Sequence, residues 1–279
     1  MERNAKPAAV VKSPAAPRTP TRLSSVANSI RLLKAFSDEE HELGVTNLAK
    51  RLGLAKSTVH RLASTLIRED MLEQDSETGR YRLGLALFEL GARVRRKMNV
   101  FNEAQFALKD LVEKTGETAH LTVLDHTSVL YLYKVESRQA IRMKSVLGAR
   151  APAHCSADGK ALLAFQSAEV VDSVLNLGLP ALTPKTLTNA EALTADLAQI
   201  RARGYAIDDE ETETGLRSLA APVRDHRGEV VAAISIAGPV QRMNKKVLVS
   251  YAPAVVSAAN LVSLRLGHLP QRHGRLRAA

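Results

Sequence analysis

Apolar positions near the start of the chain recur at helical spacing. The stretch SSVANSIRLLKAF, residues 24–36, places apolar side chains at intervals of three or four behind a serine, which predicts a first helix with a serine cap. The polar cluster SDEEHELG, residues 37–44, then ends that helix. Its expected inward positions are Val26, Ile30, Leu33 and Phe36.

The next segment, residues 45–70, predicts two helices around a tight turn. Thr46 is the expected cap of the first helix, and Gly53 stands where a left-handed C-terminal residue is favoured. The second helix begins after residues 53–55. Its apolar stripe of Val59, Leu62 and Leu66 is expected to be buried, which turns a polar set outward. That set consists of Lys56, Ser57, Thr58, His60, Arg61 and Thr65.

This outward set suggests a DNA-binding surface. A short glycine-containing turn between two short helices is typical of a helix-turn-helix, whose second helix enters the major groove of DNA. There, hydroxyl groups reach phosphates or base edges, and Lys or Arg bonds to guanine. No carboxylate follows Lys56 until Glu69, so nothing in this stretch would repel the phosphates. An ordinary amphipathic helix in a small helical domain is the alternative interpretation.

The stretch MLEQDSETGRYRLG, residues 71–84, predicts a β-hairpin directly after this helix. Turn-forming residues separate two short apolar runs, and Tyr81 and Leu83 alternate with Arg80 and Arg82. We expect the tyrosine and the leucine to pack on the domain and both arginines to face outward. Such a hairpin is the wing of a winged helix-turn-helix, in which the arginines contact the phosphate backbone. A salt-bridged hairpin of ordinary function is the alternative.

The rest of the chain predicts a linker helix and an α+β domain. LALFELGARVRRKM, residues 85–98, is helical, with Leu87, Leu90 and Val94 on one side. Beyond it, strand pairs with turns at residues 125–128 and 225–228 are mixed with helices, without strict alternation of strand and helix. This order predicts a largely antiparallel sheet. The last helix is expected from about Lys245 to Leu266.

Composition narrows the class of protein. The 279 residues suffice for two domains, 45% of them are hydrophobic, and neither a run of about 18 apolar residues nor a secretion signal is evident, so we expect a cytoplasmic protein with no membrane partner. Cys155 is the only cysteine, which fits a reducing compartment and leaves little room for a structural metal. The net charge of +10 is densest at residues 1–22, where five cations accompany one anion. Such a basic segment suits a nucleic-acid partner, and a solvated tail explains it nearly as well.

The patterns together divide the chain into five segments. Residues 1–22 hold four of the eleven prolines and no apolar periodicity, which predicts a disordered basic arm. A winged helix-turn-helix domain is expected at residues 23–84 and a linker helix at residues 85–99. An effector-binding and oligomerisation domain is expected at residues 100–268, followed by a basic tail at residues 269–279.

Several stretches in order resemble the IclR family of bacterial transcriptional regulators. The resemblance rests on SVANSIRLLKAF, LAKRLGLAKSTVHRLASTL, GRYRLGLALFELG, GETAHLTVLDHTSVLYLYKVES, GARAPAHCSADGKALLAF, GYAIDDEETETGLRSLAAPV and GEVVAAISIAGP. It implies a winged helix-turn-helix joined by a linker helix to a GAF-like α+β effector domain. It also implies a homodimer or homotetramer on a pseudo-palindromic double-stranded operator, more often as a repressor, controlled by a small organic effector, often a carboxylic acid.

The same resemblance implies an effector pocket. The family's positions fall on Met143, Ala151, Ala157, Asp158, Asp208, Ser218 and Ser235. Asp158 is the main departure, because a small neutral residue is common there. Its carboxylate either caps the helix that begins at this point, which is the orientation we expect, or points into the pocket. In the second case it would oppose an anionic effector and favour one with hydroxyl groups or an amine. A DNA-binding oligomer without an effector is the alternative function.

Catalysis is not expected. His154 adjoins Cys155, but adjacency in sequence does not provide the geometry that a nucleophile and its base require. The histidines show no spacing typical of a metal site, and no sequence feature calls for a cofactor. The sequence thus predicts a regulator rather than an enzyme.

Overall fold

The computed structural model describes residues 24–37, 39–143 and 145–269. The chain divides into one unit up to Arg96 and a second from Lys97, and each is described here by itself. The predicted arm at residues 1–22 and all but the first residue of the predicted tail lie outside the described residues.

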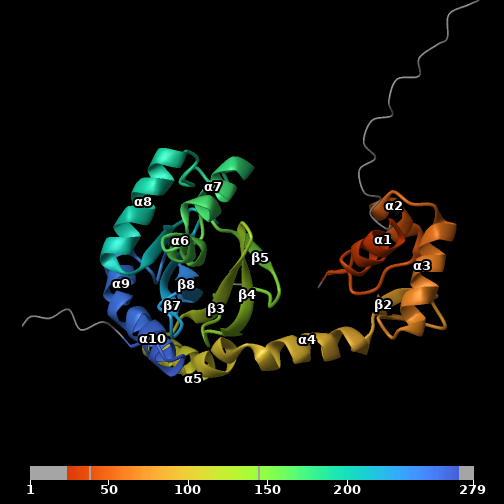
Figure 1. The fold of residues 1–279 in the computed structure, drawn as a ribbon, viewed down its shortest axis with the longest axis horizontal. Helices are drawn as coiled ribbons and strands as arrows, with labels where there is room; N and C mark the ends of the chain where they lie inside the picture. Colours follow the sequence, from red (N-terminus) through yellow and green to blue (C-terminus); the bar gives the residue numbers. More distant parts are fainter. Residues whose placement is uncertain (1–23, 38, 144, 270–279) are drawn as a thin grey trace, which may run out of the picture. The chain divides into compact units, whose positions relative to one another are not determined.

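The first unit packs three helices and a hairpin around one small core, and a fourth helix, α4, follows them (Figure 1). Its elements are α1 (Ser24–Leu33), α2 (Val45–Leu52), α3 (Lys56–Arg68), β1 (Leu72–Gln74), β2 (Tyr81–Leu83) and α4 (Leu85–Lys97). Gly53 ends α2 in the left-handed conformation with a φ of 68°, as the sequence predicted. The core is formed by Leu32, Leu43, Leu48, Ala49, Leu52, Val59, Leu62, Ala63, Leu72 and Tyr81.

Details of this unit differ from the expected pattern. Val26 and Ile30 are exposed, because the side of α1 that meets the core carries Leu32 instead. Gly44, rather than Thr46, precedes the first turn of α2, and no side chain caps that helix. Leu83 is exposed, since Tyr81 already fills the covered face of the three-residue strand.

The linker helix α4 has no buried residue in this chain. The apolar side expected from the sequence is therefore not packed: Leu90 and Val94 are exposed, as are Leu85 and Phe88. Hydrophobic periodicity predicted the helix correctly, but the apolar side chains on it are not buried by any other element of the described chain.

The second unit is built on a six-stranded antiparallel sheet, which confirms the predicted α+β class (Figure 1). The strands lie in the order β5-β4-β3-β8-β7-β6. Their bounds are β3 (Thr118–Asp125), β4 (Ser128–Val135), β5 (Arg150–Pro152), β6 (Ala206–Asp209), β7 (Leu216–Arg224) and β8 (Val230–Pro239). The helices are α5 (Asn99–Thr115), α6 (Ala157–Leu163), α7 (Ala168–Leu177), α8 (Ala190–Arg203), α9 (Lys245–Ser250) and α10 (Ala252–Arg265).

Helices cover both faces of this sheet. On β7, Leu219 and Ala221 pack with α5 and α10, whereas Ala220 between them packs with α6 and α8, as the alternation of side chains along a strand requires. The stretch Lys245–Arg265 is long and apolar enough to cross a membrane by length and composition, but Val255 and Val262 lie in the core of this unit. Its apolar character is thus that of a core helix.

Two elements, β5 and α7, were not predicted from the sequence. One predicted helix is divided into α9 and α10. β5 has three residues, too few for a visible alternation. The helix expected from Lys245 breaks at Tyr251, next to Pro253, which occupies the first turn of α10.

Candidate functional site

The outward face of α3 carries donors and cations without a carboxylate. Val59, Leu62 and Ala63 are buried and orient the helix, while Leu66 is only half-buried. Five of the six predicted DNA-contacting residues on α3 are exposed, and the sixth, Thr58, is half-buried. The exposed residues are Lys56, Ser57, His60, Arg61 and Thr65.

The two arginines of the wing differ in their surroundings. Arg82 donates from Nε to Glu73 Oε2 at 2.8 Å and lies 3.7 Å from Glu42, so its charge is largely compensated. Arg80 precedes β2, is exposed, and has no ion pair among the described residues. The two arginines look equivalent in the sequence, because the cross-strand register that pairs Glu73 with Arg82 is not visible there.

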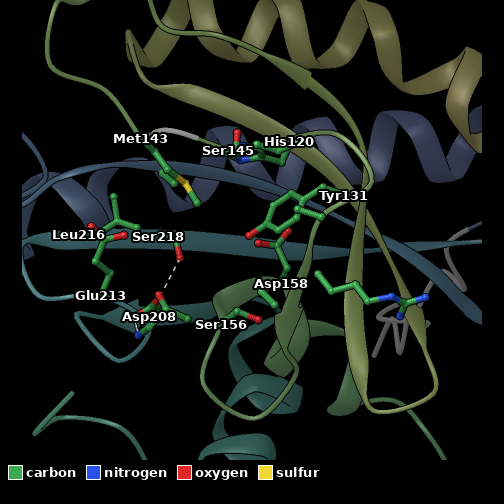
Figure 2. A pocket seen from close by; sticks show the side chains of 16 residues that line it. His120, Tyr131, Met143, Ser145, Ser156, Asp158, Asp208, Glu213, Leu216 and Ser218 are labelled. Atoms are coloured by element: carbon green, nitrogen blue, oxygen red, sulfur yellow. Dashed lines mark hydrogen bonds between the residues drawn. The ribbon is translucent and has the colours of Figure 1, made fainter. Parts of the chain in front are cut away.

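The second unit contains a partly open cavity of about 250 Å³ on one side of its sheet (Figure 2). Strands β3 and β4, the segment before β5, the start of α6 and the segment that joins β6 to β7 form its walls. Its volume corresponds to roughly eight water molecules, which suits a compact metabolite. It is lined by His120, Tyr131, Met143, Ser145, Val146, Ala149, Arg150, Ala151, Ser156, Asp158, Asp208, Thr212, Glu213, Leu216, Ser218 and Ala237.

The first turn of α6 is held close to this cavity by its cap and by a glycine. Ser156 is the N-cap: its Oγ accepts from the backbone N–H of Gly159 at 3.1 Å and donates to Pro152 O at 2.9 Å. A Cβ at Gly159 would lie 2.3 Å from the carbonyl oxygen of Ala153, so only glycine permits this approach. The backbone at the start of α6 is thereby held against Ala153, the residue that follows β5.

Asp158 points into the cavity and does not cap the helix, contrary to the expected orientation, because Ser156 already occupies the capping position. Its carboxylate faces the Tyr131 ring in Figure 2. Thr122 Oγ1 donates to Asp158 Oδ1 at 2.9 Å. Burial raises the pKa of Asp158 to about 6, and the hydrogen bond from Thr122 opposes that shift. At neutral pH the cavity therefore contains a mostly ionised carboxylate.

Asp208, the second acidic group of the wall, organises the segment between β6 and β7. Its Oδ1 accepts from the backbone N–H of Glu211 at 2.6 Å, and its Oδ2 accepts from the hydroxyls of Thr212 and Ser218, the latter at 3.4 Å. Burial raises the pKa of Asp208, and these donors work against the shift. The Asp208 carboxylate is thus already hydrogen-bonded within the protein.

Behind the pocket wall, a buried cation joins α6, α8 and the segment after β6. Lys160 is 1% exposed, and its Nζ lies 2.5 Å from Glu211 Oε1 and 2.9 Å from Asp196 Oδ2. Burial raises the pKa of Glu211 to about 7, although Lys160 favours its ionised form. Glu211 Oε2 is buried and has no hydrogen-bond partner in the described part of the chain.

The structure brings most of the predicted effector positions together. Met143, Ala151, Asp158, Asp208 and Ser218 line the cavity. Ala157 and Ser235 are fully buried beside it and are not part of its lining. Ala237 also lines the cavity, where its small side chain leaves space.

Sequence reasoning missed His120 and Tyr131, which enter the cavity from paired strands. Their rings contact edge to face with centroids 5.2 Å apart, and His120 Nε2 lies 2.8 Å from Ser145 Oγ. Burial lowers the pKa of His120 to about 3, so this ring is neutral. The strand alternation placed both on one face, but no sequence signal distinguished that face from the hydrophobic core.

The two residues weighed for catalysis are not activated. Burial raises the pKa of the Cys155 thiol to about 12, so it holds its proton at neutral pH. His154 Nε2 lies 3.1 Å from the carbonyl oxygen of Pro180, and burial lowers its pKa. Among the described residues, no group of three or more His, Cys, Asp or Glu side chains is placed to hold a metal ion.

Comparison with known proteins covers both units. Residues 25–76 match the family described as "IclR helix-turn-helix domain", and residues 92–264 match "Bacterial transcriptional regulator IclR C-terminal". The HTH-type transcriptional regulator KdgR of Escherichia coli (strain K12) is 37% identical over 252 residues, which cover 90% of this chain and 95% of the relative. The transcriptional repressor IclR of the same organism is 35% identical over 266 residues, 94% and 97% of the two chains.

A solved structure adds a ligand to this comparison. The crystal structure of an IclR homolog complexed with 4-hydroxybenzoate, from Microbacterium hydrocarbonoxydans, matches with a TM-score of 0.77 at 28% identity. The match covers 87% of this chain and 98% of that chain.

Proposed function

The chain belongs to the IclR family of bacterial transcriptional regulators, and from this premise we propose that α3 reads an operator while the cavity of the second unit binds a small organic effector that changes operator affinity. The predicted family is thereby confirmed. Its relatives are transcriptional regulators and not enzymes, which agrees with the unactivated Cys155.

The exposed face of α3 is the observation that carries the proposal for DNA. Lys56, Ser57 and Arg61 lie in the first two turns of α3, the part of a recognition helix that enters the major groove. Arg61 suits a bidentate contact to guanine O6 and N7, and the hydroxyls suit phosphates or base edges. On the wing, Arg80 is more available to a DNA phosphate than Arg82, because Arg82 already pairs with Glu73.

The cavity supports control by an effector. Its lining combines hydroxyl, carboxyl and small apolar side chains around about 250 Å³, and a related protein of this fold is complexed with 4-hydroxybenzoate. An organic acid of this size is the proposed effector class. The alternative, a DNA-binding oligomer with no effector, would be favoured by a filled interior, but Ala151, Ser218 and Ala237 leave space instead.

The working assembly that we propose is a homodimer or homotetramer in the cytoplasm, bound to a pseudo-palindromic operator as a repressor. Two copies of α3 held about one DNA turn apart would read two half-sites at once, so protein symmetry would match operator symmetry. Fusion to a fluorescent protein and sedimentation of the purified chain would test location and assembly.

An operator-binding assay tests the DNA part of this proposal. After selection of an operator from random DNA, Arg61→Ala is expected to weaken operator binding by about 1–3 kcal/mol and to relax specificity at one base position. Lys246→Ala, an exposed cation on α9, is the matched control and should bind like the unmodified protein. Equal operator affinity of Arg61→Ala and the unmodified protein would show that α3 is not the reading helix.

A thermal-shift screen against small organic acids tests the effector part. A ligand at one hundred times its dissociation constant stabilises the folded state by about 2.7 kcal/mol, which is readily detected. A stabilising acid that also changes operator affinity supports the proposal, and a screen without any such acid supports the effector-free alternative.

A further inference from the structure

Three carboxylates line the pocket, and the two buried ones, Asp158 and Asp208, differ in their surroundings, whereas Glu213 is exposed. A carboxylate offers about four acceptor positions. Asp208 receives the backbone N–H of Glu211 and the hydroxyls of Thr212 and Ser218, so little of that capacity is left. Asp158 receives a hydrogen bond from Thr122 on Oδ1, the Ser235 hydroxyl and the backbone N–H of Asp158 also lower its pKa, and its carboxylate faces the cavity (Figure 2). Asp158 is therefore the buried acidic group of the wall whose carboxylate is directed at a ligand beside Tyr131.

Tyr131 supplies a complementary group beside Asp158. It lies opposite Thr122 in the pairing of β3 with β4, and Thr122 contacts Asp158, so the strand register places the tyrosine next to the carboxylate. The Tyr131 hydroxyl forms no hydrogen bond within the described residues. Burial, together with the charge of Asp158, raises the pKa of Tyr131, so the phenol stays neutral and can both donate and accept.

This pair discriminates between ligand groups by their donors and acceptors. A ligand carboxylate offers acceptors only and has the same charge as Asp158. An ammonium group offers donors only, so it can donate to Asp158 and to the Tyr131 oxygen but leaves the phenol O–H without an acceptor in the ligand. A hydroxyl group can donate to Asp158 and accept from Tyr131 at the same time. Leaving either buried group without a partner would cost binding free energy, so the pair selects for a hydroxyl.

We propose that Asp158 determines effector specificity by accepting a hydrogen bond from a hydroxyl group of the effector, with Tyr131 as the second partner of that hydroxyl. The pocket then selects a hydroxylated acid over an acid of the same chain length that lacks hydroxyl groups. This inference rests on the proposed effector function and adds to it the chemical class of the ligand. The hydroxyls of Ser145, Ser156 and Thr212 are engaged within the protein, but their oxygens lie in the same wall and can accept from further hydroxyl groups of such a ligand.

Matched pairs of acids test the selection. Calorimetric titration of the full-length protein would compare D-gluconate with hexanoate and D-glycerate with propionate, because each pair shares chain length and carboxylate and differs in hydroxyl groups. At least one hydroxylated acid is expected to bind about a hundredfold or more tighter than its partner, since a site that hydrogen-bonds a hydroxyl discriminates strongly against the analogue without it. Equal or tighter binding of the acid without hydroxyls in both pairs would overturn the inference.

Two variants assign the selection to the named residues. Asp158→Ala is expected to lower affinity for the preferred hydroxylated acid by about tenfold or more and to leave affinity for its partner acid equal or higher, because like-charge repulsion is removed. Tyr131→Phe keeps the ring and removes only the hydroxyl, so it is the second variant if Asp158→Ala fails to fold by circular dichroism. Unchanged discrimination in a folded variant of either kind contradicts the proposed pairing.

Operator binding measured in the same samples distinguishes failure of the selection by Asp158 from failure of the effector function. If hexanoate and propionate bind at least as tightly as their hydroxylated partners and change operator affinity, the effector function stands and the selection by Asp158 is wrong. If none of the four acids binds or changes operator affinity, the inference about Asp158 is overturned together with the acid-effector part of the proposed function, while operator binding through α3 is unaffected.

Discussion

Replacing Lys160 by methionine is expected to destabilise the second unit strongly. Methionine keeps an unbranched chain of similar length but removes the charge from a position that is 1% exposed. Glu211 and Asp196, at 2.5 and 2.9 Å from Nζ, then remain beside each other without their shared buried cation. Removing one partner of a buried ion pair costs about 3–5 kcal/mol, because the remaining charge is left uncompensated. At about 2–4 °C per kcal/mol, the melting temperature of this unit should fall by between about 6 and 20 °C.

Differential scanning calorimetry of the full-length protein measures this effect, since each unit can give its own transition. Lys185→Met is the matched control, because Lys185 also pairs with a glutamate, Glu210, but is half exposed, and such surface pairs contribute about 0–1 kcal/mol. The double variant Lys160→Met with Glu211→Gln should recover part of the loss, as expected for residues in one network. A melting temperature for Lys160→Met equal to that of Lys185→Met would refute the assigned role of the buried cation.

Three further predictions concern the pH response, the packing of α6 and the wing. Burial raises the pKa of Glu211 from 4.5 to about 7, so the folded state binds more protons than the unfolded state between these pH values. The stabilisation that proton binding to Glu211 gives the folded state is therefore complete below about pH 4.5 and is lost as pH rises through 7. Relative to the unmodified protein, Glu211→Gln should therefore gain stability as pH rises from 4.5 to 8 in urea denaturation, and a constant difference across this range would contradict it. Gly159→Ala should lower the melting temperature and the affinity for any effector, because its Cβ meets backbone at 2.3 Å. Gly91→Ala in the exposed α4, where a Cβ meets nothing, should instead stabilise its helix by about 0.5–1 kcal/mol, and equal melting temperatures would count against the packing argument. Arg80→Ala should reduce the slope of log affinity for DNA against log salt by about 0.9, as for one lost phosphate contact, and Arg82→Ala should reduce it less because Glu73 already compensates that charge. Identical slopes for both variants in fluorescence anisotropy would show that the wing arginines are equivalent.

The fold was predictable where periodicity and turn residues determine it locally. The αL residue at Gly53, the start of α3 at Lys56 and the turns of both long hairpins of the second unit were all visible in the sequence. The predictions that were wrong concerned contacts between helices and strands. The burial of Leu32 in place of Ile30 reflects which side of α1 meets α2 and α3, and that choice has no signature within a single helix.

The pocket was predictable to a smaller extent. The resemblance to the family located Met143, Ala151 and Ser218 in its wall, but the orientation of Asp158 depended on whether the serine two residues earlier takes the cap. Both assignments satisfy the same local pattern, so the sequence alone left them open. The buried network joins Lys160 to partners 36 and 51 residues away, beyond the reach of any local rule.

The serine cap of α6 has a consequence for how this regulator can diverge. Because Ser156 provides the hydrogen bond that the start of the helix requires, residue 158 carries no capping duty and can vary without loss of that bond. The scaffold and the recognition group are thus encoded by different codons, two positions apart. A duplicated gene could therefore acquire specificity for a new effector through a change at codon 158, while Ser156 continues to cap α6.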